Sequence, residues 1–361
     1  MKKILILPTI AIALVAFAFA GIAGGHANAA GTTLNVQVGG GEPGYAVTEF
    51  LPNSMTIITG TTVHYTFPWL EPHSVTMGTE PAGEPTISTG SGTFPNDKGY
   101  LTTDLTFGDP ANPPSFDVTF AKAGTYDVFC FIHPLMHSAV KVVDDGSPVQ
   151  SQVDNQHSLD ARGAANYVSA LADLKAVAAG ITNAGAAVAS KPGGAKQYTF
   201  TVGGATQYGD AMQFFPAAGK VNEGDSIVFK NTTFTPHTVT FGEEPHGDPF
   251  ETPGDKSGQS FSGGNLNSGI IAVDQENPNR PTSFEVTFSK AGTYNYMCML
   301  HDPQGMVGSV TVASRTAPGA PNTGTGIVDD VNANTGWYLV AGALALAALV
   351  AGTSVAAARR N

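Results

Sequence analysis

An eleven-residue segment occurs twice in this 361-residue chain, and the repeat constrains the fold more than any other feature. Residues 116–126 read FDVTFAKAGTY and residues 284–294 read FEVTFSKAGTY, so only two positions differ. Further upstream, residues 71–78 (EPHSVTMG) correspond to residues 235–242 (TPHTVTFG). Two copies of one domain, each of about 110 residues, therefore account for most of the chain.

The residue pattern inside each copy predicts β-strands. In the first copy, apolar and polar residues alternate over short segments separated by clusters of Gly, Pro and Asn: residues 34–38, 62–67, 116–120 and 126–129. Alternation with a period of two is typical of strands that bury one face. We therefore expect an all-β protein in which residues 31–145 and 196–313 each form an antiparallel β-sandwich.

The segment between the copies, residues 146–195, has a different composition. Its central part is rich in Ala, and its larger apolar residues recur at helical spacing: Leu159, Tyr167, Leu171 and Leu174. This pattern predicts a partly helical linker, interrupted near Gly180, that sets the separation of the two domains. Residues 314–336 are rich in Gly, Pro, Thr and Asn, which is typical of a flexible stalk.

Residues 1–29 are typical of a secretory signal peptide. Two lysines precede an apolar run over residues 4–20, and small residues then lead to an Ala27-Asn28-Ala29 cleavage site. A signal-anchor helix is the alternative, but the A-x-A ending favours export with cleavage. We therefore expect the mature protein to lie outside the cytoplasm.

A second apolar run, residues 337–358, predicts a C-terminal transmembrane helix. It carries no charge and is long enough, at about 1.5 Å per residue, to span a bilayer. Arg359 and Arg360 follow it and are expected to stay on the cytoplasmic side. Residues 320–324 (APNTG) resemble a sortase sorting signal, so covalent attachment to a cell wall is the alternative to a lipid span.

The charge of the chain bears on its partners. With 17 basic and 29 acidic side chains the net charge is −12. A strongly acidic surface repels phosphate backbones and anionic lipid, so nucleic acid is not expected as a partner.

Four metal-binding residue types recur in both copies in the same order. A His lies on an early segment, and a Cys, a His and a Met follow with short spacing on a later one. The candidates are His73, Cys130, His133 and Met136 in the first copy, and His237, Cys298, His301 and Met306 in the second. This donor set suits copper, because soft sulfur favours Cu(I) and imidazole serves both oxidation states.

The set resembles the cupredoxin, or blue-copper, family, and the resemblance spans both copies. Cys298-x2-His301-x4-Met306 is similar to plastocyanin, whereas the first copy has a shorter loop between its Cys and its Met, as in amicyanin. The resemblance implies two tandem Greek-key sandwiches, each holding one type 1 copper ion through the four residues named above. It also implies transfer of single electrons to redox partner proteins, with the exposed edges of His133 and His301 as electron ports.

Two features depart from the family pattern or complicate it. Asn often follows the upstream His in the family, whereas Ser74 and Thr238 stand there, and their hydroxyls could supply hydrogen bonds around the ligands. His137, next to the Met of the first copy, is an alternative fourth ligand. The unequal loops also suggest unequal reduction potentials, and hence a relay of electrons from one domain to the other.

Other interpretations use the same residues. A disulfide between Cys130 and Cys298 is ordinary for an exported chain, but it leaves both sets of histidines unexplained. A copper storage or delivery protein would use the same ligands as a carrier. A two-domain copper oxidase or nitrite reductase needs further histidines, commonly in His-x-His pairs or beside the Cys, and the sequence has neither. We therefore expect no enzymatic activity.

Overall fold

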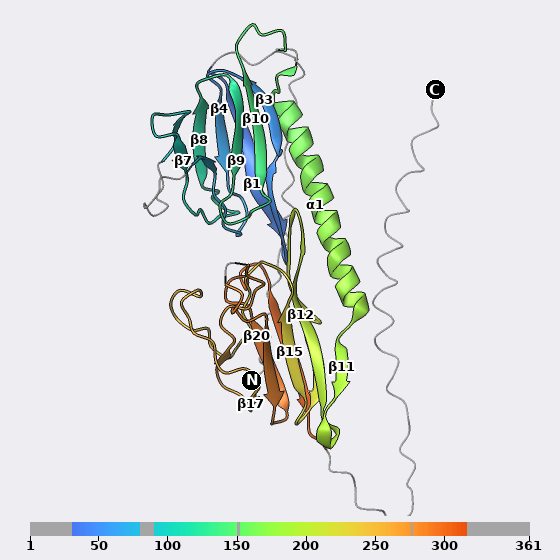
Figure 1. Cartoon of the computed structure of the whole chain (residues 1–361). Coiled ribbons are helices and arrows are strands. Elements are labelled where there is room, and N and C mark those ends of the chain that lie inside the picture. The colour runs from blue at the N-terminus through green and yellow to red at the C-terminus, as the bar shows by residue number, and fades with distance from the viewer. Residues whose placement is uncertain (1–30, 80–89, 150–151, 276, 316–361) are drawn as a thin grey trace, which may run out of the picture. The chain divides into compact units, whose positions relative to one another are not determined.

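The computed structural model describes residues 31–79, 90–149, 152–275 and 277–315, and within them the two copies fold alike (Figure 1). The first copy contains β1 (Thr33–Glu42), β2 (Tyr45–Leu51), β3 (Ser54–Ile58), β4 (Thr62–Thr66), β5 (Thr76–Gly78), β6 (Gly92–Phe94), β7 (Tyr100–Thr102), β8 (Ser115–Phe120), β9 (Gly124–Phe129) and β10 (His137–Val143). The second contains β12 (Lys196–Thr206), β13 (Gly209–Phe215), β14 (Ala218–Asn222), β15 (Ser226–Asn231), β16 (Thr240–Phe241), β17 (Gln259–Phe261), β18 (Leu266–Asn267), β19 (Ser283–Phe288), β20 (Gly292–Met297) and β21 (Val307–Ala313). Each strand of the first copy has a counterpart in the second.

Two sheets face each other in each copy. In the first copy, one sheet has the order β2-β1-β4-β8-β6 and the other β3-β10-β9-β5-β7. Apolar side chains of both sheets share one buried core, for example Val36 and Phe120 from the first sheet and Ile57 and Val140 from the second. The second copy repeats both orders with β13-β12-β15-β19-β17 and β14-β21-β20-β16-β18. The mainly β architecture is that of a β-sandwich, as expected.

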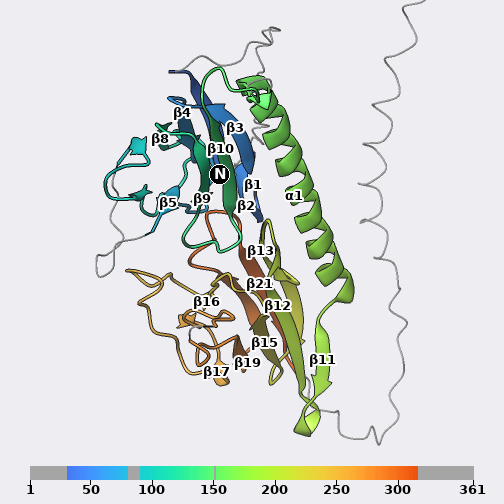
Figure 2. The same cartoon turned by 45° about the horizontal axis from the view of Figure 1, so that its top comes forward.

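The copies are joined through their edge strands β2 and β13 (Figure 2). Residues 45–47 pair with residues 209–211 in antiparallel register, so one sheet continues from the first copy into the second. The Gly44 N–H also donates to the backbone oxygen of Gln304 over 2.7 Å. This pairing satisfies backbone groups that two isolated edge strands would leave exposed.

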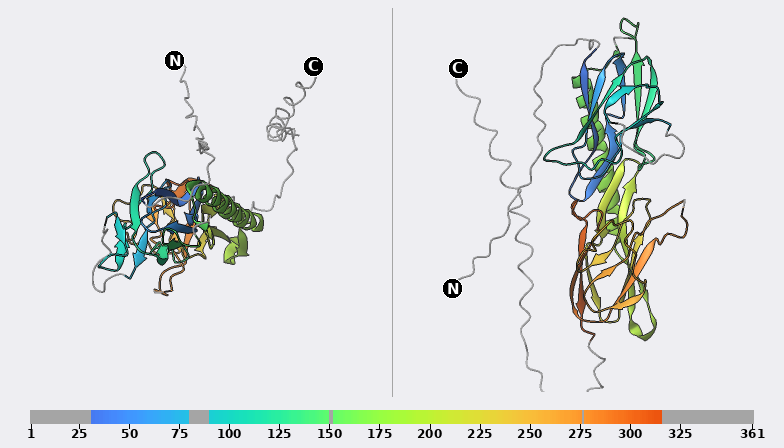
Figure 3. Two further views of the ribbon diagram at one scale, coloured as in Figure 1. Left: turned by 90° about the horizontal axis from the view of Figure 1, so that it is seen from above. Right: turned by 90° about the vertical axis from the view of Figure 1, so that its left-hand side faces the viewer.

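One helix, α1 (Gln156–Ala184), connects the copies and packs against strands of both (Figures 1 and 3). It begins with a capping box, in which the side chains of Asn155 and Ser158 each accept a hydrogen bond from the other residue's backbone N–H. Gly163 allows close approach to the first copy, since a Cβ there would lie 2.9 Å from the backbone oxygen of Leu51. The helix therefore spans the junction between the two copies.

The predicted interruption near Gly180 is wrong, because α1 continues through this residue. A glycine costs a helix about 1 kcal/mol relative to alanine. Its neighbours Ala178 and Ile181 pack against Ala211 and Phe215 of β13, and this burial outweighs the glycine cost. After the helix, β11 (Ala187–Ser190) pairs with β12 and extends the shared sheet.

The predicted signal peptide (residues 1–29), the transmembrane helix (residues 337–358) and nearly all of the stalk lie outside the described residues. In the part of the chain that the structure describes, no helix is long and apolar enough to cross a membrane.

Candidate metal centres

In the first copy, the segment after β9 folds back on itself and carries Cys130, His133 and Met136. The His133 N–H donates to the Cys130 oxygen (3.3 Å), and the Met136 N–H donates to the His133 oxygen (2.9 Å). The Cys130 N–H closes the loop by donating to the Met136 oxygen (3.1 Å). Three backbone hydrogen bonds thus hold one short loop in the form that places these side chains together.

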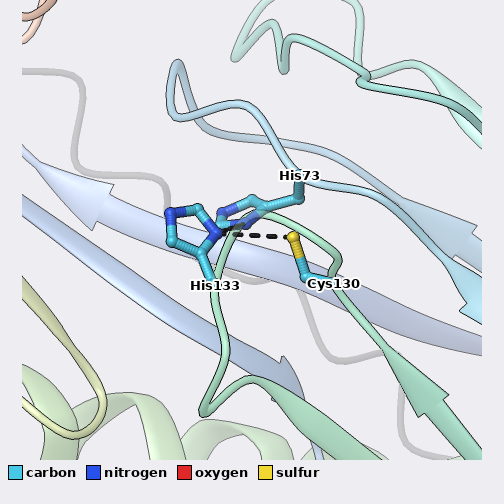
Figure 4. A group of neighbouring side chains, drawn as sticks. All are labelled: His73, Cys130 and His133. Atoms are coloured by element: carbon cyan, nitrogen blue, oxygen red, sulfur yellow. Dashed lines mark hydrogen bonds between the residues drawn. The ribbon is translucent and has the colours of Figure 1, made fainter. Parts of the chain in front are cut away.

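His73 reaches the same point from a separate loop, as Figure 4 shows. It is anchored by an isolated bridge to Thr106, whose backbone oxygen accepts from the His73 N–H over 3.0 Å. Its Nδ1 lies 3.1 Å from Nδ1 of His133, and the latter lies 3.4 Å from Sγ of Cys130. One sulfur and two imidazole nitrogens therefore converge within 4.8 Å of one another, which is a group that can hold a metal ion.

The second copy repeats this arrangement. Nδ1 of His237 lies 3.0 Å from Nδ1 of His301, and Sγ of Cys298 lies 3.4 Å from the His301 nitrogen and 3.8 Å from the His237 nitrogen. His237 forms a bridge to Ile271 that matches the bridge of the first copy. Both cysteines are buried and free, so the alternative disulfide between them is not formed.

The two methionines lie at the ends of the same loops. Met136 and Met306 are fully buried and belong to the apolar clusters that contain Cys130 and Cys298. His137, the alternative fourth ligand, is exposed and has both ring nitrogens engaged elsewhere. Its Nδ1 lies 3.0 Å from the Asp127 carboxylate and its Nε2 lies 3.1 Å from the backbone oxygen of Pro134.

The residues after the upstream histidines support the cysteines. The Ser74 N–H donates to Sγ of Cys130 over 3.3 Å, and the Ser74 hydroxyl accepts from the Phe131 N–H over 3.0 Å. Thr238 makes the same two contacts in the second copy, at 3.3 Å and 2.8 Å. The two hydroxyls thus fix the backbone that follows each candidate cysteine.

The charges within each group favour a thiolate. Burial by itself would raise the pKa of the Cys130 thiol, but hydrogen bonds and positive charge from His133 and His73 lower the pKa to about 5. Burial would likewise lower the pKa of His133, but its anionic neighbours raise it to about 10. In the second copy the same balance lowers the pKa of Cys298 despite its burial and raises the pKa of His301 to about 9. Because metals bind the thiolate, the donor chemistry of both groups fits copper.

Two glycines that were not among the predicted site residues make room for the upstream histidines. Gly39 in β1 and Gly203 in β12 occupy strand irregularities with φ of +67° and +71°. A Cβ on Gly39 would lie 2.2 Å from Nε2 of His73, and a Cβ on Gly203 would lie 2.4 Å from Nε2 of His237. The available signal was a repeated Val-Gly-Gly at residues 38–40 and 202–204.

The imidazole edges of His133 and His301, which were expected to be exposed electron ports, are largely shielded from solvent. The His301 side chain is only 6% exposed and that of His133 is 17% exposed. Buried Glu71 lies against both, with Oε1 3.5 Å from Nε2 of His133 and Oε2 3.9 Å from Nε2 of His301. The prediction of an exposed port is therefore wrong for His301, because a residue of the first copy covers it.

Glu71 is a third residue of the site, after Gly39 and Gly203, that was not predicted from the sequence. Burial by itself would raise the pKa of its carboxyl, but the interaction with His133 and the positive charge of nearby histidines lower the pKa to about 2. The second copy has Thr235 at the corresponding position, so Glu71 is not part of the repeat. No local pattern separates it from a surface glutamate.

Fold and site together define a β-sandwich protein whose copies each hold a buried Cys-His-His group. Residues 200–313 match the family model of copper binding proteins of the plastocyanin/azurin family. Plastocyanin of Rumex obtusifolius is 34% identical over 104 residues, which cover 28% of this chain and 89% of the relative. Plastocyanin B'/B'' of Nicotiana tabacum is 36% identical over 103 residues, which cover 28% of this chain and 88% of the relative. The chain belongs to the cupredoxin family of copper-binding proteins.

Solved structures of an amicyanin and of a plastocyanin are also similar to this chain. A mutant amicyanin in its Cu(I) form is 21% identical, with 32% of this chain and 81% of that chain covered and a TM-score of 0.21. A mutant fern plastocyanin is 22% identical, with 32% of this chain and 98% of that chain covered and a TM-score of 0.21.

Proposed function

We propose that this protein carries single electrons outside the cytoplasm through two type 1 copper sites, one in each copy. The observation that carries the proposal is that two independent loops in each copy bring one thiolate and two imidazole nitrogens to one buried point. The proposed ligands are His73, Cys130, His133 and Met136 in the first site, and His237, Cys298, His301 and Met306 in the second. Family membership and plastocyanin relatives support a carrier rather than an enzyme.

The chain's own residues give such a site its character. Copper supplies one-electron chemistry when bound, alternating between Cu(II) and Cu(I). The backbone hydrogen bonds of the Cys-to-Met loops and the bridges of His73 and His237 hold the donors in one geometry. A fixed donor set limits rearrangement when the charge changes. We assign the fourth position to Met136 rather than His137, because both His137 nitrogens are engaged at the surface.

We further propose that the protein is exported and tethered by residues 337–358, with redox proteins as its partners. The signal-like N-terminus and the uncharged C-terminal run support this assignment. Attachment through residues 320–324 to a cell wall would serve the same purpose.

The direct test is a visible absorption spectrum of the Cu(II)-loaded full chain beside Cys130→Ser and Cys298→Ser variants. Each variant should lose about half of an intense thiolate-to-copper band, because each removes one of two similar sites. Reversible one-electron voltammetry should separate a carrier from a storage protein. A wild-type protein without the intense band would refute the proposal.

A further inference from the structure

Glu71 stands at the point where the two metal groups approach each other. It is buried in the loop after β4, two residues before His73. Each of its two carboxylate oxygens faces a different copy, one toward Nε2 of His133 (3.5 Å) and the other toward Nε2 of His301 (3.9 Å). Nε2 of Gln304, which lies in the Cys-to-Met loop of the second copy, also donates to Oε2 over 3.0 Å.

The orientation of the two imidazoles determines which of their nitrogens faces the Glu71 carboxylate. In both histidines Nδ1 faces the cysteine sulfur and the other histidine of the same group. A metal held by that group takes Nδ1, so the proton of each imidazole resides on Nε2. His133 and His301 therefore both present an N–H to the same carboxylate. An outer carboxylate next to such an N–H orients the ring of a metal-binding histidine.

The surrounding structure holds this contact in place. Gly44 and Gln304 are hydrogen bonded through their backbones, β2 pairs with β13, and α1 packs against both copies. Gln304 is only 3% exposed, so little solvent reaches the second-copy side of the carboxylate. The imidazole edge of the second site thus faces the first site rather than an external partner.

We infer that Glu71 links the two metal sites, positioning both imidazoles and providing the route His133–Glu71–His301 by which an electron passes between them. The inference rests on the proposed function. In this step one site loses one electron and the other gains it, while both Nε2 protons stay on their imidazoles. No further oxidant or reductant takes part in the exchange.

The test compares Glu71→Gln with Glu49→Gln in the full copper-loaded chain. Glu49 is a matched control, because it is also a buried glutamate of the first copy but pairs with Asn53. A pulse of a one-electron reductant adds one electron to the copper-loaded chain, and the movement of this electron between the two sites is followed by absorption. The Cys130→Ser and Cys298→Ser variants supply the reference spectrum of each single site. Glu71→Gln replaces one of the two acceptor oxygens by an NH2 donor, so one imidazole loses its outer acceptor and the exchange should slow by about tenfold.

A second readout does not depend on electron transfer. In the fully reduced wild-type protein, NMR should detect slowly exchanging Nε2 protons on both His133 and His301. Glu71→Gln should speed the exchange of at least one of them, and Glu49→Gln should leave both unchanged. Rapid exchange of the His301 proton in the wild type would overturn the inference even if the Glu71 variant does not fold.

The two proposals fail in different ways. A wild-type chain without blue-copper bands would refute the proposed function. If both absorption bands were intact and electrons moved between the sites at the same rate in the wild type and in Glu71→Gln, only the inference that Glu71 links the sites would be refuted.

Discussion

Replacing Gly39 by Ala should damage the first proposed metal site without replacing any of its ligands. The new Cβ would lie 2.2 Å from Nε2 of His73 and 2.5 Å from its Cδ2, whereas real Cβ contacts are not shorter than 3.0 Å. The ring has little room to retreat, because His73 is only 1% exposed and its Nδ1 already lies 3.1 Å from that of His133. The substitution must therefore displace either the ring or β1.

The magnitude follows from two contributions. A side chain at a positive φ costs about 1–2 kcal/mol. Forcing the His73 ring away from its preferred rotamer costs about 0.5–1.5 kcal/mol more. The free energy of unfolding of the metal-free protein should fall by about 1.5–3.5 kcal/mol in urea denaturation. The intense absorption of the first site should be lost or shifted, while that of the second site stays.

Gly99→Ala is the matched control. Gly99 has φ of +65°, nearly the value of Gly39, but a Cβ there meets nothing within 4 Å. It should show the backbone cost alone and leave both absorption bands intact. If Gly39→Ala behaved like Gly99→Ala, Gly39 would not be required to make room for His73. Gly203→Ala should mirror the effect on the second site.

Three further predictions concern the fourth ligand, the helix and an ion pair. Met136→Ala should alter the spectrum and potential of the first site, whereas His137→Ala should change neither; the reverse result in voltammetry would assign His137 as the ligand. Leu174→Ala, at a fully buried position of α1, should lower the free energy of unfolding by about 2–5 kcal/mol, and Val168→Ala, exposed on the same helix, should have little effect in the same denaturation assay. Burial by itself would raise the pKa of the Glu285 carboxyl, but hydrogen bonds led by that of Lys191 lower the pKa below its usual 4.5. The resulting stabilisation is under about 1 kcal/mol, because the Lys191–Glu285 pair is partly exposed. It is fully present above pH 4.5 and is lost as the pH falls through the lowered pKa of Glu285. Glu285→Gln should therefore destabilise the protein at neutral pH but not in acid. Unfolding curves with equal wild-type and variant stability at pH 7 would contradict this.

The sequence by itself determined the repeated domain and predicted the residue types of its two candidate metal groups. Both are local properties: alternation of apolar residues predicts strands, and Cys298 and His301 lie only three positions apart, so one loop brings them together. His73 and His237 were also identifiable, because the repeat places each before a matching strand.

Tertiary structure alone decided how the two copies are connected. Pairing of residues 45–47 with residues 209–211 depends on which edges meet, and strand edges carry no mark of their partner in the sequence. The continuity of α1 through Gly180 likewise depends on packing against β13, which offsets a local preference against helix.

Glu71 is the clearest case of a role that the sequence does not contain. Its neighbours in the chain explain His73, but its contacts with His133 and His301 join segments about 60 and 230 positions away, across both copies. A glutamate is ordinarily a surface residue, and only burial between two imidazoles distinguishes this one. The repeat predicted two candidate metal groups, whereas the approach of their edges to one carboxylate arises only when the copies pack together.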